Sequence, residues 1–488
     1  MESHSLSTPS SQRPDTERWL LFFFLLSLAL LNPWVRGDGV GYYAFARAPL
    51  IERNLNFEPD YIAANTGFRE LRLDEHGQPK QIFRTRTGHL DNHFTVGPAM
   101  LWMPFLLLAH ASVLVAHALG SQVAADGFSA PYRLAMAVGT AFWGFLGLLL
   151  SFRLARQYVA DLWAFLATIS VWWASSLPVY MYFNPSWSHA HSAFAASLFI
   201  SYWHQTRQQR TLRQWLVLAL IAGLMLNVYY ANAMLLMILV VEALREYAAA
   251  FRRDSPAGAA VTQLLAKHSL FVAITLLSLL PTFVTRYIVY GSPFESGYVS
   301  VQDWAWRSPH FLAVLFSSEH GLFSWTPVLL FATLGLVLFK WREPRVGTPL
   351  LAAALAFYIL IACYPDWAGI SSFGNRFFIS LTPLFIIGLS VFLQSAATLF
   401  RSQRVALVSM TLILATFVLW NAAFMFQWGA HLIPPRGPIS WNAMVRNQFE
   451  VVPRQIAGRL NDYLFHRHDL MRQIEDRDID QLKKQTMP

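Results

Sequence analysis

The chain has few charged residues for its length and only one cysteine. Asp, Glu, Lys and Arg make up 13% of its 488 residues, about half of the roughly 25% found in soluble domains. The shortage is uneven, because charges gather in short runs between long stretches that contain almost none. This pattern argues against a soluble globular fold and is typical of membrane-spanning helices separated by loops.

Cys363 is the only cysteine, so an intrachain disulfide and a cysteine-based metal cluster are both excluded. The sequence also lacks GxxxxGK followed by Ser or Thr, and it lacks GxGxxG after an expected strand. These absences argue against an ATP-driven pump. The formal net charge is +9, but the basic residues are scattered over loops, so we expect no nucleic-acid partner.

Aromatic residues are abundant, with 18 Trp and 38 Phe, and many stand at the ends of apolar runs. Such rings prefer the level of the lipid headgroups. The apolar segments cover residues 19–35, 97–119, 132–152, 162–177, 190–203, 215–229, 231–244, 270–290, 325–339, 350–363, 378–393 and 405–428. The sequence therefore predicts an all-α integral membrane protein that contacts membrane lipids.

Polar segments divide the chain into three parts. Residues 1–18 form a polar start, residues 19–428 a polytopic membrane domain, and residues 429–488 a polar tail at the surface. Inside the membrane domain, a long polar stretch begins at residue 36 and mixes acids with bases. It is too long for a tight connection, so we expect a folded loop with short amphipathic helices.

Basic residues give the expected topology, because short cytoplasmic loops carry an excess of Lys and Arg. One set of loops holds fourteen of them: Arg153, Arg156, Arg207, Arg210, Arg213, Arg245, Arg252, Arg253, Lys267, Lys340, Arg342, Arg345, Arg401 and Arg404. The alternate set holds little beyond Arg307 and Arg376. We therefore place residues 1–18 in the cytoplasm.

Residues 1–18 and Arg153 are both expected in the cytoplasm, so an even number of crossings must lie between them. Segments 19–35 and 132–152 supply two crossings, and segment 97–119 would add a third. We therefore expect this segment, which contains Pro98 and Pro104, to lie in the outer leaflet without crossing. The first outer loop then runs over residues 36–130. About eleven transmembrane helices result, with the tail of residues 429–488 outside.

Asp38 is the first candidate functional residue. It follows the first apolar segment in GDGVGYY, with glycines on both sides and Tyr42 and Tyr43 close behind. A carboxylate at the membrane boundary can accept a proton from a hydroxyl group. The alternative interpretation is a solvated or helix-capping Asp.

The segment NPSWSHAHS brings Asn184, His189 and His191 to the outer ends of two expected helices. Residues two apart on a helix point to different faces, so this His pair is poorly spaced for sharing a metal ion. Hydrogen bonding to a substrate and packing at the interface are the stronger alternatives. Asn92 and His93, which precede segment 97–119, are a weaker signal of the same kind.

Two more outer segments carry polar residues: Glu319 and His320 lie in SSEHGLFSWTP, and Asn375 and Arg376 lie in FGNRFF at the start of a helix. Arginine matches phosphate through its planar fork, and a helix start favours an anion. Arg376 is therefore a candidate phosphate ligand. An arginine that reaches towards lipid headgroups is the alternative.

Together these residues resemble the GT-C membrane glycosyltransferases, which include protein O-mannosyltransferases, lipid A aminoarabinose transferases and oligosaccharyltransferase catalytic subunits. The resemblance rests on the acid in GDGVGYYAFARAPL, the long first outer loop, the proline-containing segment VGPAMLWMPFLLLAH and the late segment NRFFISLTPLF. More narrowly, DGVGYY with NHFTVGPAMLWMPF is similar to a group of bacterial membrane proteins classed as glycosyltransferases. The resemblance implies a GT-C-like helical bundle over nearly all of the chain.

The resemblance also implies the chemistry. The donor would be a sugar linked to polyprenyl phosphate, Asp38 would activate the acceptor, and Arg376 with Asn375 would contact the lipid phosphate. Tyr42, Tyr43, Asn92, His93, Asn184, His189, His191, Glu319 and His320 would be candidates for substrate binding. The acceptor would be a glycan, lipid or protein outside the cytoplasm, at a bacterial inner membrane.

Two departures from the family concern metal binding. Gly39 follows Asp38 where several relatives have a second acid. Asn184, His189 and His191 stand where the metal-dependent oligosaccharyltransferases have carboxylates. We therefore predict no metal site and no other cofactor, with a divalent metal as the alternative. The prediction is an inverting glycosyltransferase. The alternatives are a flippase for lipid-linked glycans, or a glycan polymerase or ligase that uses a diphosphate-linked donor.

Overall fold

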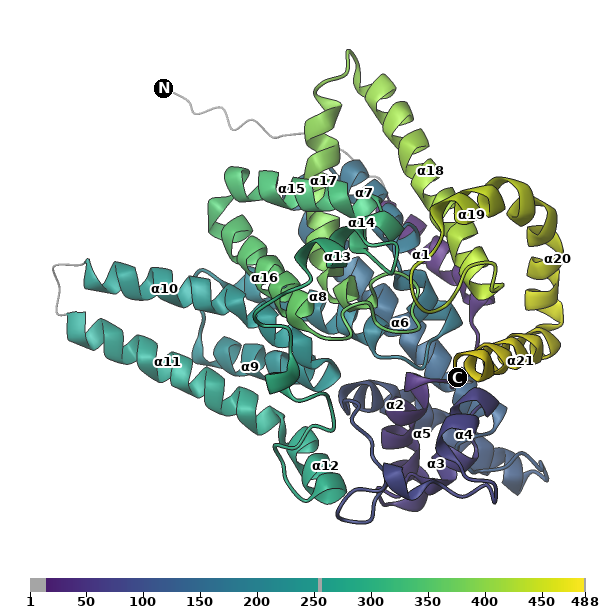
Figure 1. Cartoon of the computed structure of the whole chain (residues 1–488). Coiled ribbons are helices and arrows are strands. Elements are labelled where there is room, and N and C mark those ends of the chain that lie inside the picture. The colour runs from purple at the N-terminus through teal and green to yellow at the C-terminus, as the bar shows by residue number, and fades with distance from the viewer. Residues whose placement is uncertain (1–14, 253–256, 487–488) are drawn as a thin grey trace, which may run out of the picture.

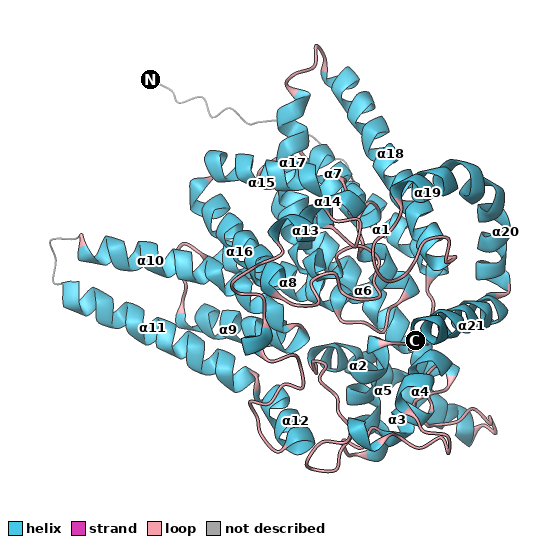
Figure 2. Cartoon of the chain, viewed as in Figure 1, coloured by secondary structure: helices cyan, strands magenta, loops and turns pink. Residues whose placement is uncertain are grey.

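The computed structural model describes residues 15–252 and 257–486. Within these residues the chain is built from helices joined by loops, and it contains two isolated β-bridges but no strand (Figure 2). The prediction of an all-α protein is confirmed for the described part of the chain.

The helices of the first half are α1 (Thr16–Ser27), α2 (Asp38–Arg47), α3 (Glu58–Ile62), α4 (Thr66–Arg72), α5 (Gly97–Ala118), α6 (Ala130–Ala155), α7 (Asp161–Trp173), α8 (His189–Thr206), α9 (Leu212–Val228) and α10 (Met237–Phe251). Those of the second half are α11 (Ala257–Ser278), α12 (Leu280–Tyr290), α13 (Phe311–Phe316), α14 (Leu322–Trp325), α15 (Val328–Arg342), α16 (Pro344–Cys363), α17 (Thr382–Ala397), α18 (Gln403–Gly429), α19 (Trp441–Arg446), α20 (Val452–Phe465) and α21 (Arg467–Thr486). Short 3-10 or π turns precede α8 (Val179–Phe183), α10 (Tyr230–Leu236) and α17 (Arg376–Leu381).

Helix α17 forms the centre of the bundle, and it packs against α15, α7 and α6 (Figure 1). Its residues from Thr382 to Val391 are all buried, as expected of a helix that is apolar all round. Gly388 and Gly335 let α17 and α15 approach closely, because a Cβ at Gly335 would collide with the carbonyl oxygen of Gly388. The centre of the bundle is therefore a tightly packed scaffold.

The outer helices show the opposite pattern. Helices α11 and α18 expose large apolar side chains, such as Leu265, Leu277, Leu412 and Leu419. Among the described residues, six helical segments are long and apolar enough to cross a membrane: Gly97–Ala118, Ala130–Ala155, Gly258–Ser278, Pro344–Cys363, Arg376–Ala397 and Gln403–Gly429. The chain is a multi-pass membrane protein. The number of eleven crossings stays a prediction, since the other expected segments form shorter or interrupted helices.

Two expected segments are divided in the structure. The expected segment 270–290 is shared between α11 and α12, which separate at Leu279 because Pro281 starts a new helix. The expected segment 19–35 ends its α-helix at Ser27 and continues as a 3-10 turn and a loop. This loop brings the chain to Asp38, the first residue of α2.

The first outer loop contains α2, α3, α4 and α5, so short helices are present there as predicted. Helix α5 runs antiparallel to the first half of α6: Trp102 donates to Thr140, and the His110 ring lies 2.6 Å from the Tyr132 hydroxyl. The second half of α6 packs instead against α8, where Ser151 meets Ser197 at 2.9 Å. Helix α5 thus accompanies only one end of α6.

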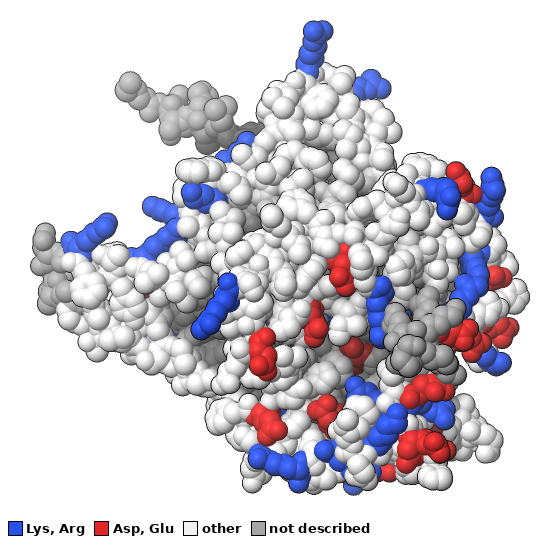
Figure 3. Space-filling view, viewed as in Figure 1, with Lys and Arg blue, Asp and Glu red and all other residues white. Residues whose placement is uncertain are grey.

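Charge is distributed unevenly over the surface. In the view of Figure 3, Lys and Arg stand largely without acidic neighbours around α10, α15 and the turn between α17 and α18. Acidic and basic side chains are mixed over α2–α5 and α19–α21. This difference is the one that the positive-inside rule uses, and the orientation that it implies stays a prediction.

Candidate functional site

A cavity of about 590 Å³ lies where the loop before α2, the end of α18 and the C-terminal helices α20 and α21 meet. Most of its wall is apolar and includes Leu30, Trp173, Val179, Phe183, Met425, Phe426, Ile456, Leu460, Leu470 and Ile474. Its polar members include Arg36, Asp38, Asn184, Arg376, His431 and Asp478. Such a wall suits a ligand that has both an apolar chain and a charged head.

Asp38 enters the cavity at the start of α2. Gly37 has a φ of 54°, a conformation that glycine adopts without strain. Gly39 lies so close to Ser186 that a Cβ would collide with the serine side chain. These two glycines let the chain turn sharply and press α2 against the loop before α8. The carboxylate of Asp38 is consequently held at the cavity wall, with its side chain 34% exposed.

Arg376 lies opposite Asp38, at the start of the turn that precedes α17. Its Nη1 is 2.9 Å from Oδ2 of Asp38, and its guanidinium stacks 4.4 Å above the Trp187 ring. The side chain is only 11% exposed. Nε is buried and makes no hydrogen bond to any described residue, and the buried Nη1 contacts Asp38 as an ion pair without hydrogen-bond geometry. The ion pair therefore leaves donor capacity of the guanidinium unused at a cavity wall.

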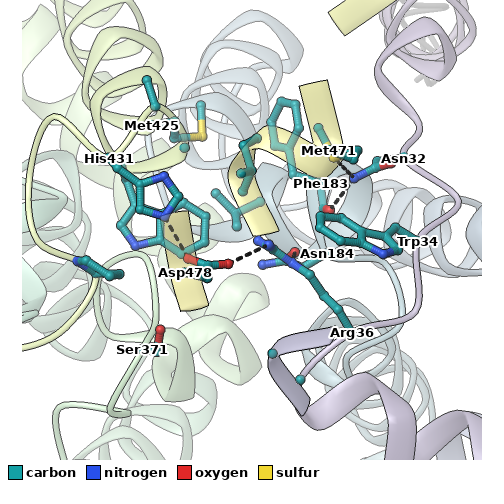
Figure 4. Close-up of a pocket in the computed structure, with 18 of the residues that line it drawn as sticks. Asn32, Trp34, Arg36, Phe183, Asn184, Ser371, Met425, His431, Met471 and Asp478 are labelled. Atoms are coloured by element: carbon teal, nitrogen blue, oxygen red, sulfur yellow. Dashed lines mark hydrogen bonds and ion pairs between the residues drawn. The ribbon is translucent and has the colours of Figure 1, made fainter. Parts of the chain in front are cut away.

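A second polar group is also connected to Trp187, because Nε1 of this residue donates to the carbonyl of Arg36 at 3.1 Å. Arg36 donates through Nε to Oδ1 of Asn184 at 2.9 Å, and its Nη1 lies 3.5 Å from Asp478. Asp478 also lies 2.7 Å from Nε2 of His431 (Figure 4). Burial lowers the pKa of Arg36, and Asp478 opposes that shift.

Among the residues predicted from the sequence, Asp38, Asn184 and Arg376 line this cavity. Tyr42 and Asn375 are buried behind its wall. The Tyr42 hydroxyl accepts a hydrogen bond from Ser188 at 2.9 Å, and burial raises the pKa of this phenol. Asn375 donates to the carbonyl of Trp367, while its Oδ1 is buried without a partner among the described residues.

Other predicted residues hold the first outer loop together. The Tyr43 hydroxyl donates to the Gly127 carbonyl at 2.7 Å, and the Asn92 side chain donates to the Gly41 carbonyl at 2.9 Å. His93 packs against Phe94 and Tyr298. None of the three predicted residues lines the cavity. Their proposed part in substrate binding therefore receives no geometric support here.

The other histidines predicted as site residues, His189, His191 and His320, are packed in the protein interior. His191 stands edge-on to the Trp102 ring at 5.0 Å, and His189 packs against Tyr180. His320 has a φ of 54° and its Nδ1 lies 2.7 Å from the Ala368 carbonyl; burial lowers its pKa to about 4. Glu319 is half-buried beside it and does not line the cavity.

No group of three or more His, Cys, Asp or Glu side chains in residues 15–252 and 257–486 is arranged to hold a metal ion. The donor set at the cavity consists of two isolated acids, each beside an arginine. Such a set offers a cation no shared pair of carboxylates.

Part of this site is not predicted from the sequence. Arg36 stands at the start of the expected first outer loop, and His431 and Asp478 belong to the tail that is expected at the surface. The signal was present in α20 and α21: Ile456 and Leu460 are four residues apart, as are Leu470 and Ile474. Such spacing gives each helix an apolar stripe.

No family model and no curated protein matches the sequence. Solved structures do match. ArnT from Cupriavidus metallidurans in the apo state has a TM-score of 0.50 at 13% identity, over 85% of this chain and 68% of that one. The archaeal oligosaccharyltransferase AglB from Archaeoglobus fulgidus also has a TM-score of 0.50 at 13% identity, over 85% of this chain and 58% of that one.

Both matched proteins are GT-C glycosyltransferases. This chain has the GT-C fold. The predicted helical bundle is thus confirmed as a GT-C-like architecture. The chain spans little more than half the length of the archaeal oligosaccharyltransferase, and this level of identity shows the fold alone.

Proposed function

We propose that this GT-C-like chain is an inverting glycosyltransferase that moves a sugar from a polyprenyl-phosphate carrier to a glycan, lipid or protein acceptor. One observation carries the proposal. Asp38 and Arg376 form an ion pair at the wall of one amphipathic cavity, and Arg376 keeps buried donors without hydrogen bonds. This transfer needs a carboxylate to accept the proton of the acceptor and a guanidinium with available N–H donors to bind the departing phosphate.

The proposed reaction is a single displacement. Asp38 takes the proton of the acceptor hydroxyl, whose oxygen attacks the anomeric carbon of the sugar. The bond from that carbon to the phosphate oxygen breaks, and both bonding electrons stay on the phosphate. The products are the glycosylated acceptor and the lipid phosphate, and the proton leaves Asp38 for water. Arg376 stabilises the charge that develops on the departing phosphate.

The ion pair fits this scheme because the Arg376 guanidinium can bind either Asp38 or the phosphate of the donor. A donor phosphate that binds Arg376 competes with Asp38 for the same Nη1. Donor binding therefore frees the carboxylate to act as a base. The apolar side of the cavity offers room for the carrier chain.

The comparisons support the donor class. The matched structure of AglB is a complex with an inhibitory peptide and a dolichol-phosphate. Phosphate on an isoprenoid chain is the chemistry that Arg376 and the apolar wall suit. We place the reaction on the extracytoplasmic face of a bacterial inner membrane, where nucleotide-sugars are absent, and the proposed scheme requires no metal or other cofactor.

The test is transfer by the purified full chain in lipid nanodiscs, supplied with undecaprenyl-phosphate-linked sugars and candidate acceptors. Asp38→Asn keeps the shape of the side chain but removes the basic oxygen, so turnover falls about 100- to 10,000-fold while donor binding is kept. Asp303→Asn, at an exposed outer position, is the matched control.

Several outcomes would contradict the proposal. Near-normal turnover of Asp38→Asn removes Asp38 as the base. Movement of the lipid-linked sugar across the bilayer without release of lipid phosphate identifies a flippase. Use of diphosphate-linked donors alone identifies a polymerase or ligase. Loss of transfer on treatment with EDTA, with recovery on adding Mg²⁺ or Mn²⁺, replaces the metal-free scheme.

A further inference from the structure

The carboxylate of Asp478 lies beside Arg36 and His431 inside the cavity. It comes from α21, and it lies 2.7 Å from Nε2 of His431 and 3.5 Å from Nη1 of Arg36 (Figure 4). The side chain of Asp478 is 35% exposed, whereas that of His431 is 7% exposed. His431 is therefore built into the wall, and the carboxylate reaches it from the more exposed side.

The geometry of His431 indicates a position held for a ligand. Its φ is 56°, a left-handed conformation that is unfavourable for a residue other than glycine. Its Nδ1 is buried without a hydrogen-bond partner among the described residues. Ile370, another residue of the cavity wall, has the same left-handed backbone. Such strained, incompletely satisfied positions concentrate at binding sites.

Arg36 is oriented independently of Asp478. Asn184 accepts from its Nε, and Trp34 lies beneath the guanidinium at 4.6 Å. The arginine would thus keep its position if Asp478 withdrew. Arg436 and Arg459 also line the cavity, half-buried, so positive charge exceeds negative charge over its polar wall.

Helix α21 rests on the cavity rather than in the bundle. It reaches the loop after α1 through Asn32, which contacts the sulfur of Met471, and α4 through Glu475, which accepts from Gly67 N at 3.3 Å. Tyr463 of α20 donates to the Leu30 carbonyl at 2.8 Å. Arg467 of α21 also donates to the carbonyls of Ala29 and Leu31, and Arg477 donates to that of Ala430. Asp478 is thus carried by a helix that is attached to the loop after α1, to α4 and to the end of α18.

We propose that Arg36 and His431 form a second anion-binding subsite, which Asp478 fills in the resting protein and a phosphate or carboxylate of the acceptor displaces. Trp187 contacts both positions, because the Arg376 guanidinium stacks on its ring and its Nε1 donates to the Arg36 carbonyl. The assignment to the acceptor rests on the proposed function. The competition between Asp478 and an anion does not.

The subsite can be tested by binding alone, with dodecyl phosphate as a simple anionic amphiphile. All measurements use the full chain carrying Arg376→Gln, so that binding at the proposed donor position is weakened. Isothermal titration in neutral detergent gives the dissociation constant. Asp478→Asn removes the competing charge and tightens binding about 5- to 20-fold. Adding Arg36→Gln to Asp478→Asn abolishes that gain.

Two controls separate competition from a loosened helix. Arg467→Gln removes hydrogen bonds from α21 to the carbonyls of Ala29 and Leu31 but keeps Asp478, so it leaves the affinity unchanged. Asp476→Asn removes an exposed charge from the same helix and also has no effect. An equal gain in either control, no gain in Asp478→Asn, or a gain that survives Arg36→Gln would overturn the subsite.

The same measurements distinguish this inference from the proposed function. If the chain transfers no sugar but Asp478→Asn still tightens dodecyl phosphate, the subsite stands and its ligand is not a glycosyl acceptor. If transfer occurs and Asp478→Asn leaves binding unchanged, the glycosyltransferase stands without the subsite. With both established, Asp478→Asn lowers the acceptor KM only for acceptors that carry an anionic group.

Discussion

At the scale of single residues, the proposed chemistry depends on the guanidinium of Arg376, which is fixed in position but does not use all of its hydrogen-bond donors. Trp187 supports Arg376 from below, Asp38 meets it from the side, and Nε faces no acceptor among the described residues. A buried arginine with unused donors is costly unless an anion completes it. We therefore expect a phosphate to bind Arg376 more tightly than it would bind an arginine whose donors are all satisfied.

Arg376→Lys tests whether the planar fork matters. Lysine keeps the charge but offers a single point of contact and stacks less well on Trp187. We expect the donor affinity of Arg376→Lys to fall about 10-fold. In Arg376→Ala the departing phosphate is no longer stabilised, so we expect kcat to fall about 100-fold. Equilibrium binding of undecaprenyl phosphate and steady-state kinetics measure the two effects.

The matched control is Arg307→Ala, which removes another basic residue expected in the outer loops, at an exposed position. It should leave donor binding unchanged. If Arg376→Ala behaves like Arg307→Ala, Arg376 is only an anchor at the membrane interface.

The sequence could single out Asp38 and Arg376 because each is a charged residue beside a long apolar segment. It could not show which way a polar side chain points in a packed loop. Tyr43 follows Asp38 in the same motif, and Asn92 precedes Phe94, a residue of the cavity wall, yet the side chains of Tyr43 and Asn92 donate to backbone carbonyls of the first outer loop. The packing of the whole loop decides these directions, and a short motif does not contain that information.

At the scale of elements, the first outer loop is held by one buried ion pair. Arg47 in α2 donates to both carboxylate oxygens of Asp60 in α3, at 2.7 Å each, and the two side chains are 1% and 2% exposed. Glu52 adds a third bond at 2.9 Å, and Phe128 stacks on the guanidinium. This pair links α2 to α3 and so helps to position Asp38.

Asp60→Asn removes the charge that balances a buried arginine. Breaking one partner of a buried pair typically costs about 3–5 kcal/mol, and Glu52 keeps the loss near the lower end. We expect a clear fall in the melting temperature of the chain in detergent. Glu58→Gln is the control, because its pair with Arg84 is partly exposed and worth about 1 kcal/mol or less. Equal melting temperatures for the two variants would show that the pair is not essential to the loop.

The C-terminal helices show why an element can escape prediction. Residues 429–488 are polar on average, and the apolar stripes of α20 and α21 are short. Their partners lie in the loop after α1 and in α4, more than 400 positions away in the sequence for the contact of Gly67 with Glu475. The stripes indicate that each helix packs against another part of the protein, but they do not indicate that this part is a cavity.

At the scale of the whole molecule, the site occupies one end of the bundle. The end that carries mixed charges contains α2–α5 and α19–α21, and the cavity lies there (Figure 3). Helix α5 belongs to this end by its packing, since it contacts α2 and runs along the first half of α6. Yet it is also one of the six segments long enough to span. Its length and its neighbours thus favour different topologies.

Labelling can decide between them, because a crossing by α5 would put its two flanks on opposite sides. In a Cys363→Ser background, cysteines at Glu75 and Ser121 flank α5, and one at Gln403 marks the turn between α17 and α18. We expect a membrane-impermeant maleimide to label the first two positions in intact spheroplasts, and the third only in inverted vesicles. The packing against α6 and the charge asymmetry both require this pattern.

If Glu75 and Ser121 label from opposite sides, α5 crosses the membrane and the total number of crossings becomes even. Residues 429–488 would then lie on the same side as residues 1–18. Asp38 and Asp478 would then be separated by the bilayer, which contradicts the cavity that they share.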